Sequence, residues 1–336
     1  MDAIVVLFAS FLAAFVPTCI YVLLAYWLDR YEKEPLWLLT VTFFWGAIPA
    51  IIVSLVVELV LDIPIQVLAT GQSADLLGGT FVAPVVEELA KAVPLVTIFW
   101  LYRREFDGLM DGLIYGALVG FGFSMSENIF YFLGAYVEGG WDDWGILVLL
   151  RGLVFGLNHA LFTSAFGVGL AYARYARGSR ARSLAPLAGL TGAVALHMIH
   201  NFFVSLPTAG LFCLVSLATD WLGVLAWLVL VLLATRQEKK WIIEELRDEV
   251  ADGLLSLEHA HAASRYRTRL RDRWDVLREH GFGRAHRLSL LHNAAAELAL
   301  KKRQLRLHGD EWGNTAEIAR LRQQIAQLVG VHRYVK

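Results

Sequence analysis

Two glutamates, Glu87 and Glu88, stand side by side in the middle of an apolar stretch from Gly78 to Tyr102 that is long enough to cross a membrane. Lys91 follows one helical turn later. An ionisable side chain at the bilayer centre costs roughly 2.5–3.5 kcal/mol on insertion scales. Polar groups at that depth pair with one another, line a wet cavity or take part in chemistry, so this cluster predicts a functional site.

Ionisable residues reach a similar depth from other apolar stretches. At 1.5 Å per helical residue, Glu87, Glu88, Glu127 and His197 lie about 13–15 Å below the outer surface, and His159 lies somewhat deeper. We therefore expect one site, built from four helices. Histidines and glutamates in a dry scaffold could hold a zinc-like ion and an activated water. Alternatively, a glutamate could activate water without a metal while histidine and asparagine stabilise an oxyanion.

The composition is that of a polytopic membrane protein followed by a soluble tail. The chain has 336 residues, of which 57% are hydrophobic and 18% are charged, and most of the charges follow residue 235. Both cysteines fall in apolar stretches and indicate neither a disulfide framework nor a thiolate metal site. The sequence contains no Gly-x-Ser-x-Gly elbow, phosphate-binding loop or His-Glu-x-x-His motif, so serine hydrolases and nucleotide-dependent enzymes have no support.

Hydropathy predicts seven membrane-spanning helices, the last two joined by a tight turn at Leu206-Pro207. We place them near 3–28, 36–61, 78–102, 108–136, 145–173, 184–206 and 210–234. Lys and Arg follow the first, third, fifth and seventh helices, whereas the loops after the second, fourth and sixth contain neither. By the positive-inside rule the N-terminus lies outside and the C-terminal tail is cytoplasmic, in the plasma membrane.

Several of the buried polar residues stand in motifs. Glu87-Glu88-Leu-Ala-Lys91 resembles the Glu-Glu-x-x-Lys motif of the PrsW family of intramembrane proteases, and Phe123-Ser-Met-Ser-Glu127 resembles its Phe-x-x-x-Glu motif. The later blocks that also match are Arg151, His159-Ala-Leu-Phe162 and His197-Met-Ile-His-Asn201. The resemblance covers roughly residues 80–205, with motif order and spacing in agreement.

This resemblance implies cleavage of a membrane-embedded substrate, which for the name-giving branch is an anti-sigma factor. The family is grouped with the type II CAAX prenyl endopeptidases and the bacteriocin-immunity-type membrane proteases. The group is described as metal-dependent, and a metal-free glutamate mechanism has also been argued. A Zn²⁺ cofactor is therefore an expectation, and the metal-free mechanism stays open.

We predict an all-α protein, with a transmembrane protease domain at 1–235 (motif core 80–205) and a cytoplasmic helical tail at 236–336. The tail helices are expected near 237–262, 264–280, 284–307 and 315–328. The tail contains alternating arginines from Arg265 to Arg273 and is either a solvated hairpin or a surface for anionic lipid or a regulatory partner. Nucleic-acid binding is not expected, since no recognisable module is present.

The predicted function is an intramembrane endopeptidase, acting on a membrane-protein substrate in the lipid bilayer. Glu87 or Glu88 activates water, Asn201 stabilises the oxyanion, and Lys91 and Arg151 set charge and orientation. The predicted metal ligands are Glu127, His159 and His197. The rival function is an ion- or proton-coupled transporter using the same Glu and His cluster, although the sequence shows no repeat relating its halves. A third reading is an inactive scaffold that acts through its tail.

Overall fold

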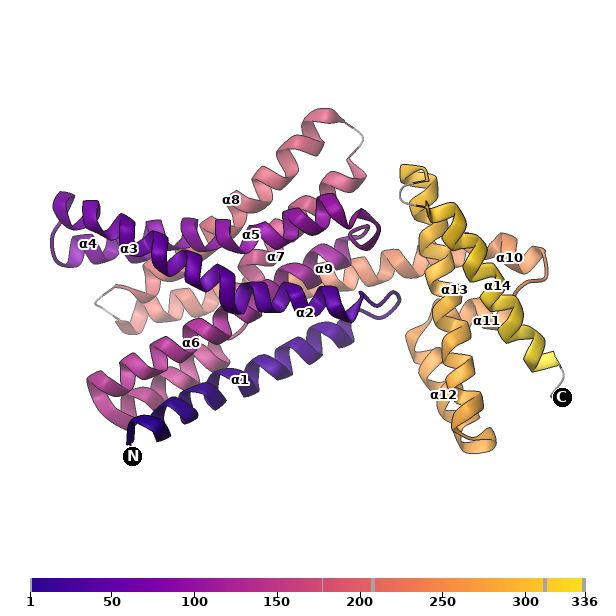
Figure 1. Cartoon of the computed structure of the whole chain (residues 1–336), viewed down its shortest axis with the longest axis horizontal. Coiled ribbons are helices and arrows are strands. Elements are labelled where there is room, and N and C mark those ends of the chain that lie inside the picture. Colours follow the sequence, from indigo (N-terminus) through magenta and orange to yellow (C-terminus); the bar gives the residue numbers. More distant parts are fainter. Residues whose placement is uncertain (1, 177, 207–208, 311–312, 334–336) are drawn as a thin grey trace. The chain divides into compact units, whose positions relative to one another are not determined.

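The computed structural model describes residues 2–176, 178–206, 209–310 and 313–333, and Figure 1 shows helices joined by short connections. No strand occurs in these ranges, so the predicted all-α fold is confirmed. The chain forms two compact units, one of residues 1–28 with 34–231 and the other of residues 29–33 with 232–336. The predicted turn at Leu206-Pro207 falls partly outside the described residues.

The first unit contains the helices that carry the predicted site. They are α1 (Asp2–Leu28), α2 (Leu36–Trp45), η1 (Gly46–Ala50), α3 (Ile51–Leu68), α4 (Gln72–Leu76), η2 (Leu77–Val82), α5 (Ala83–Leu101), η3 (Arg103–Glu105), α6 (Leu109–Leu147), η4 (Val148–Val154), α7 (Asn158–Tyr175), α8 (Ser179–Val204) and most of α9 (Ala209–Glu245). The segments η1, η2 and η4 are π-helical, a rare geometry that often occurs near functional sites.

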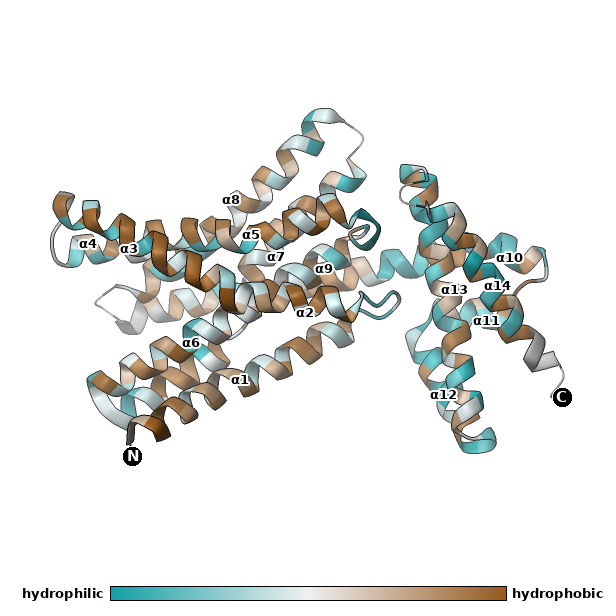
Figure 2. Ribbon diagram, viewed as in Figure 1, coloured by the Kyte–Doolittle hydropathy of each residue, from teal (hydrophilic) through white to brown (hydrophobic). Residues whose placement is uncertain are grey.

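Five stretches of the described residues are long and apolar enough to cross a membrane, and Figure 2 shows apolar residues along the helices that contain them. They are Ala3–Leu28, Leu36–Val67, Leu109–Tyr175, Ser179–Val204 and Leu214–Ala251. The predicted number of seven is not confirmed. The stretch Leu109–Tyr175 runs through 67 residues, including a turn at Gly140 (φ 73°). The predicted span at 78–102, which includes α5, is not among the five because three ionisable residues interrupt its apolar sequence.

Close backbone contact between α6 and α7 fixes the centre of the unit. Gly112, Gly116 and Gly120 recur every four residues along α6 and face α7, where a Cβ atom on any of them would overlap the α7 backbone. At Gly120 that Cβ would overlap the carbonyl oxygen of His159. The glycine stripe therefore packs helices, as the small-residue spacing predicts, and it sets the depth of His159.

The second unit is a helical domain around its own apolar core. It comprises the end of α9, α10 (Arg247–Ala251), α11 (Leu257–Ala263), α12 (Tyr266–His280), α13 (Phe282–His308) and α14 (Asn314–Arg333). The single helix predicted at 237–262 is wrong, because the chain turns after Ala251 through Gly253, whose φ is 75°. Tyr31, from the short loop 29–33, belongs to the core of this unit.

Candidate active site

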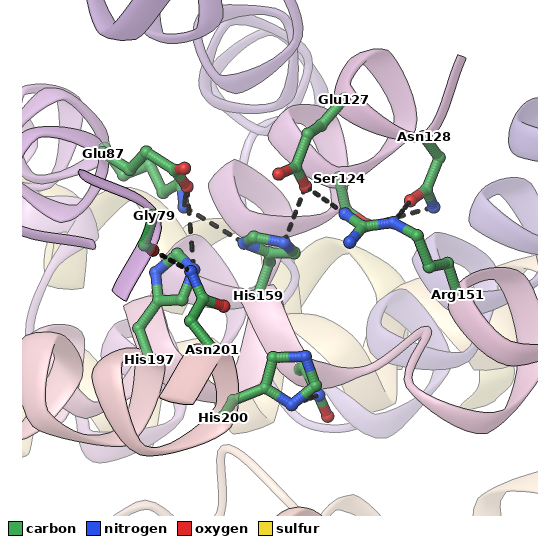
Figure 3. A network of polar contacts seen from close by, with 12 residues as sticks. Gly79, Glu87, Ser124, Glu127, Asn128, Arg151, His159, His197, His200 and Asn201 are labelled. Atoms are coloured by element: carbon green, nitrogen blue, oxygen red, sulfur yellow. Dashed lines mark hydrogen bonds and ion pairs between the residues drawn. The ribbon is translucent and has the colours of Figure 1, made fainter. Parts of the chain in front are cut away.

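Four helices of the first unit bring ionisable side chains together in its interior (Figure 3). They are Glu87, Glu88 and Lys91 from α5, Glu127 from α6, His159 from α7 and His197 from α8. All of them are buried except Glu127, which is half-buried. The convergence expected from their shared depth therefore appears in the structure as one network of contacts.

Lys91 connects the two adjacent carboxylates to the rest of the site. Its Nζ donates to Glu87 Oε2 and Glu88 Oε1 at 2.9 Å each, and lies 3.1 Å from His159 Nδ1. The side chain is fully buried and its Nζ lies 3.7 Å from the centre of the Phe123 ring. Because a buried charge is tolerated only when it is paired and hydrogen-bonded, these contacts explain why the ammonium can stay at this depth.

The protonation of His159 follows from its two neighbours. Lys91 has no acceptor, so His159 Nδ1 must accept, and Nε2 carries the proton that is donated to Glu127 Oε2 at 2.9 Å. A lone pair of this imidazole is therefore turned toward the Lys91 and Glu87 side of the site.

His197 is fixed in the same manner by Glu88. Its Nδ1 lies 3.1 Å from Glu88 Oε1 and donates to that carboxylate, while Nε2 lies 3.9 Å from Glu87 Oε2. The other oxygen of Glu88 accepts a hydrogen bond from Thr163 Oγ1 at 3.0 Å. Glu88 therefore has both oxygens occupied and acts on His197, whereas Glu87 lies beside the free nitrogen of His197 and shares Lys91 with His159.

Glu87, His159 and His197 offer the donor set of a divalent metal. One ligand atom from each lies within 4.8 Å of the others, and all three residues are buried. Two neutral imidazoles and a carboxylate are a common ligand set of catalytic zinc, and carboxylates that hold the second nitrogen of each imidazole are typical of such sites. Among the site residues, Glu87, Glu88 and Glu127 face two cationic side chains, Lys91 and Arg151, so the charge balance also admits a cation.

The predicted ligand Glu127 has other partners in this arrangement. Its Oε2 accepts from Arg151 Nη2 at 2.6 Å and from His159 Nε2 at 2.9 Å. Arg151, at the π-helical segment η4, also donates from Nε to Asn128 Oδ1 at 2.8 Å and lies over the Tyr131 ring at 3.7 Å. The geometry thus favours Glu87 over Glu127 as the third ligand, with Glu127 and Arg151 orienting His159.

Asn201 lies one turn beyond His197 on α8. Its Nδ2 donates to the carbonyl oxygen of Gly79 in η2 at 2.9 Å, and Figure 3 shows the amide beside the His197 ring. This contact joins α8 to the segment that precedes α5. The predicted part of Asn201 in stabilising an oxyanion stays a prediction.

A second buried polar cluster lies behind the histidines and was not foreseen. Asp220 Oδ2, on α9, receives hydrogen bonds from Asn158 Nδ2 at 3.0 Å, His200 Nδ1 at 2.7 Å and Ser216 Oγ at 3.2 Å. Asp220 is only 4% exposed. Asn158 precedes His159, so this cluster fixes the start of α7 against α8 and α9.

Comparisons with known proteins agree with the motifs. A family model described as PrsW family intramembrane metalloprotease matches residues 34–234. The chain is 32% identical over 150 residues to Protease PrsW of Geobacillus kaustophilus (strain HTA426), and the match covers 44% of this chain and 59% of that protein. The chain thus spans less than two thirds of the length of this relative. No solved structure matches the chain.

Proposed function

Because the chain belongs to the PrsW family of intramembrane metalloproteases, we propose that it hydrolyses a peptide bond of a membrane-embedded protein at the site formed by Glu87, His159 and His197. The observation that carries this proposal is the direction of the two imidazoles. Each has its N–H bound to a glutamate. The remaining nitrogen of His197 lies 3.9 Å from Glu87 Oε2, and that of His159 accepts from Lys91, which also binds Glu87.

The same observation supports a metal-dependent mechanism over a metal-free one. Stabilising an oxyanion without a metal needs N–H donors that face the substrate. The N–H groups of His159 and His197 already donate to Glu127 and Glu88, so the remaining nitrogen of each ring is an acceptor. That of His159 accepts from Lys91 here and would exchange this bond for the metal. Zn²⁺ fits these acceptors. When bound, such an ion polarises a carbonyl and acidifies water.

The side chains of the site then have separate roles in the reaction. Oε1 of Glu87 makes no hydrogen bond to any described residue, so it is the carboxylate oxygen free to take the proton of the attacking water and pass it to the leaving amine. Glu88 and Glu127 hold the imidazoles, and Arg151 holds Glu127. Asn201 Nδ2 supplies a donor for the developing oxyanion once its bond to Gly79 opens.

We also propose an orientation in the membrane, a substrate class and a role for the tail. The distribution of Lys and Arg supports an outer N-terminus, a cytoplasmic tail and a site in the outer half of the plasma membrane. Regulated proteolysis of an anti-sigma-type factor, and the wider grouping with CAAX-type proteases, rest on the family resemblance alone. Binding of anionic lipid or a regulatory partner by the tail rests on its arginines.

The test combines metal content with cleavage in purified protein. Wild type is expected to contain about one zinc per chain and to cleave members of a library of single-span transmembrane peptides in proteoliposomes, read out by mass spectrometry. A His159→Ala, His197→Ala double variant should lose the zinc. Glu87→Gln should lower cleavage by about 100-fold or more, whereas Glu105→Gln, a control in η3, should leave it unchanged.

Three other results would contradict the proposed site, the metal or the protease function. Full cleavage by a folded Glu87→Gln variant would refute the proposed site. Cleavage without zinc in wild type would refute the metal and leave the glutamate mechanism. Absence of cleavage together with a Glu87-dependent ion or proton flux would identify the protein as a carrier.

A further inference from the structure

Helix α3 has one packed face and one exposed face. The exposed residues of its first half are apolar and include Ile52, Val53, Leu55, Val56 and Leu59. The packed face begins at Ala50 and Ile51, which form a cluster with Ala90 of α5 and Phe123 of α6. Ser54 and Glu58 follow on that face at one-turn intervals. Both polar residues therefore point toward α5 and α6, away from the apolar outer face.

The same cluster places this face beside the active site. One turn beyond the cluster in the same direction, α5 presents Glu87, three residues before Ala90, and α6 presents Glu127, four residues after Phe123. On α3, Ser54 lies about 6 Å and Glu58 about 12 Å beyond Ala50. Glu58 thus lies on the face of α3 that packs beside the site.

Ser54 and Glu58 carry buried polar atoms without a hydrogen-bond partner among the described residues. Ser54 Oγ and Glu58 Oε1 are both in this state, and Ser54 is 1% exposed. Five threonines of the same unit behave differently, because their hydroxyls donate to the carbonyl four residues earlier in the helix. These are Thr18, Thr40, Thr42, Thr97 and Thr219. An unpaired buried polar group is costly, so these two atoms are available for a ligand.

Resting on the proposed function, we infer that Ser54 and Glu58 form a subsite for the unwound backbone of the substrate. A transmembrane helix must open before a peptide bond can be cleaved, and its freed N–H and C=O groups find no water in the membrane. Glu58 Oε1 accepts a backbone N–H and Ser54 Oγ donates to a backbone C=O. Residues i and i+4 of a helix stand about 5–6 Å apart, close to the two-residue repeat of about 6.6 Å along one edge of an extended chain.

The test is a double-mutant cycle between enzyme and substrate. A transmembrane peptide that wild type cleaves is synthesised as a series in which each backbone amide near the scissile bond is N-methylated, which removes one N–H at a time. Cleavage by wild type, Glu58→Ala, Ser54→Ala and the control Asp62→Asn is then measured. Asp62 lies one turn beyond Glu58 on α3 and is exposed.

With the unmodified peptide, Glu58→Ala should lower kcat/KM about tenfold, and Asp62→Asn should not. One N-methyl position should cost wild type about the same factor and cost Glu58→Ala nothing further, since both changes remove one bond. Ser54→Ala should lower kcat/KM several-fold and leave that N-methyl effect intact.

An equal loss for every peptide, or no loss in either α3 variant, would overturn the subsite. Both results require active wild type, so they differ from failure of the proposed protease function, in which wild type cleaves no peptide. Zinc content of Glu58→Ala, expected to equal that of wild type, separates a substrate contact from damage to the metal site.

Discussion

At the scale of the residue, the neighbours Glu87 and Glu88 have different partners. Successive helical residues point about 100° apart, and the partners on other helices decide what each does. Glu88 contacts Lys91, His197 and Thr163. Glu87 contacts Lys91 and lies beside the free nitrogen of His197. A carboxylate that accepts from the imidazole of a metal ligand, as Glu88 accepts from His197, orients that ligand and does not itself react.

Glu88→Gln should therefore lower zinc affinity about 10–100-fold without abolishing binding. The amide oxygen can still accept from His197 Nδ1, but the charge that raises the basicity of the imidazole is gone. The measurement is competition with a chelator of known affinity, using wild type, Glu88→Gln and Glu105→Gln, with thermal unfolding as the check on folding. Equal zinc affinity in wild type and Glu88→Gln would show that Glu88 does not orient a ligand.

The sequence predicted which residues would meet more readily than what each would bind. Position along each helix was enough to predict that Glu87, Glu127, His159 and His197 lie at a similar level, because helices have a regular rise per residue. The preference for Glu87 over Glu127 as a ligand depends on Arg151, which arrives from a π-helical segment that no periodicity indicates. Thr163 could have been found, since it lies one turn after His159.

At the scale of the element, the α6–α7 contact holds His159 in place. A Cβ on Gly120 would overlap the His159 carbonyl oxygen and lie 2.6 Å from the Ala160 nitrogen, so Gly120→Ala must push α7 away. We expect a loss of about 1–3 kcal/mol in stability and about 100-fold in kcat/KM, because a shift near 1 Å misplaces a reacting group.

Gly134 on the same helix provides the control. Outside the backbone of its own helix, no atom lies within 4 Å of a Cβ built there, so Gly134→Ala should leave activity unchanged and stabilise the helix by about 0.5–1 kcal/mol. Thermal unfolding and peptide cleavage measured on both variants would check this. If Gly120→Ala retained the activity of Gly134→Ala, the close contact would not be what positions His159.

The start of α7 is a helix boundary that the local sequence does not predict. The break between η4 and α7 is fixed by Asn158, whose partner Asp220 comes from α9. A contact between residues 62 positions apart leaves no local signal, so the sequence around Asp220 does not indicate its burial or its partner. The glycine stripe, in contrast, is local and predicted its own packing face.

At the scale of the whole molecule, hydropathy separated an apolar region from a charged one, and the structure has two units. What hydropathy could not predict is that residues 29–33, which lie between two apolar helices, belong with residues 232–336. Tyr31 is 6% exposed, its hydroxyl donates to Ser264 O at 2.9 Å, and Glu32 pairs with Lys301 at 2.9 Å. These contacts join residues more than 200 positions apart, beyond the reach of any periodic pattern.

Tyr31→Ala should therefore loosen the C-terminal unit, although the substitution lies next to α1. Removing a buried aromatic ring costs about 3–5 kcal/mol, whereas Tyr31→Phe loses one hydrogen bond and about 0.5–1.5 kcal/mol. Amide hydrogen exchange of peptides from α12 and α13 should accelerate by roughly two orders of magnitude in Tyr31→Ala and much less in Tyr31→Phe. Trp37→Ala, which removes an exposed ring from α2, should leave that exchange unchanged. If Tyr31→Ala exchanged like wild type, the loop would not contribute to the core of this unit, and the unit would be residues 232–336 alone.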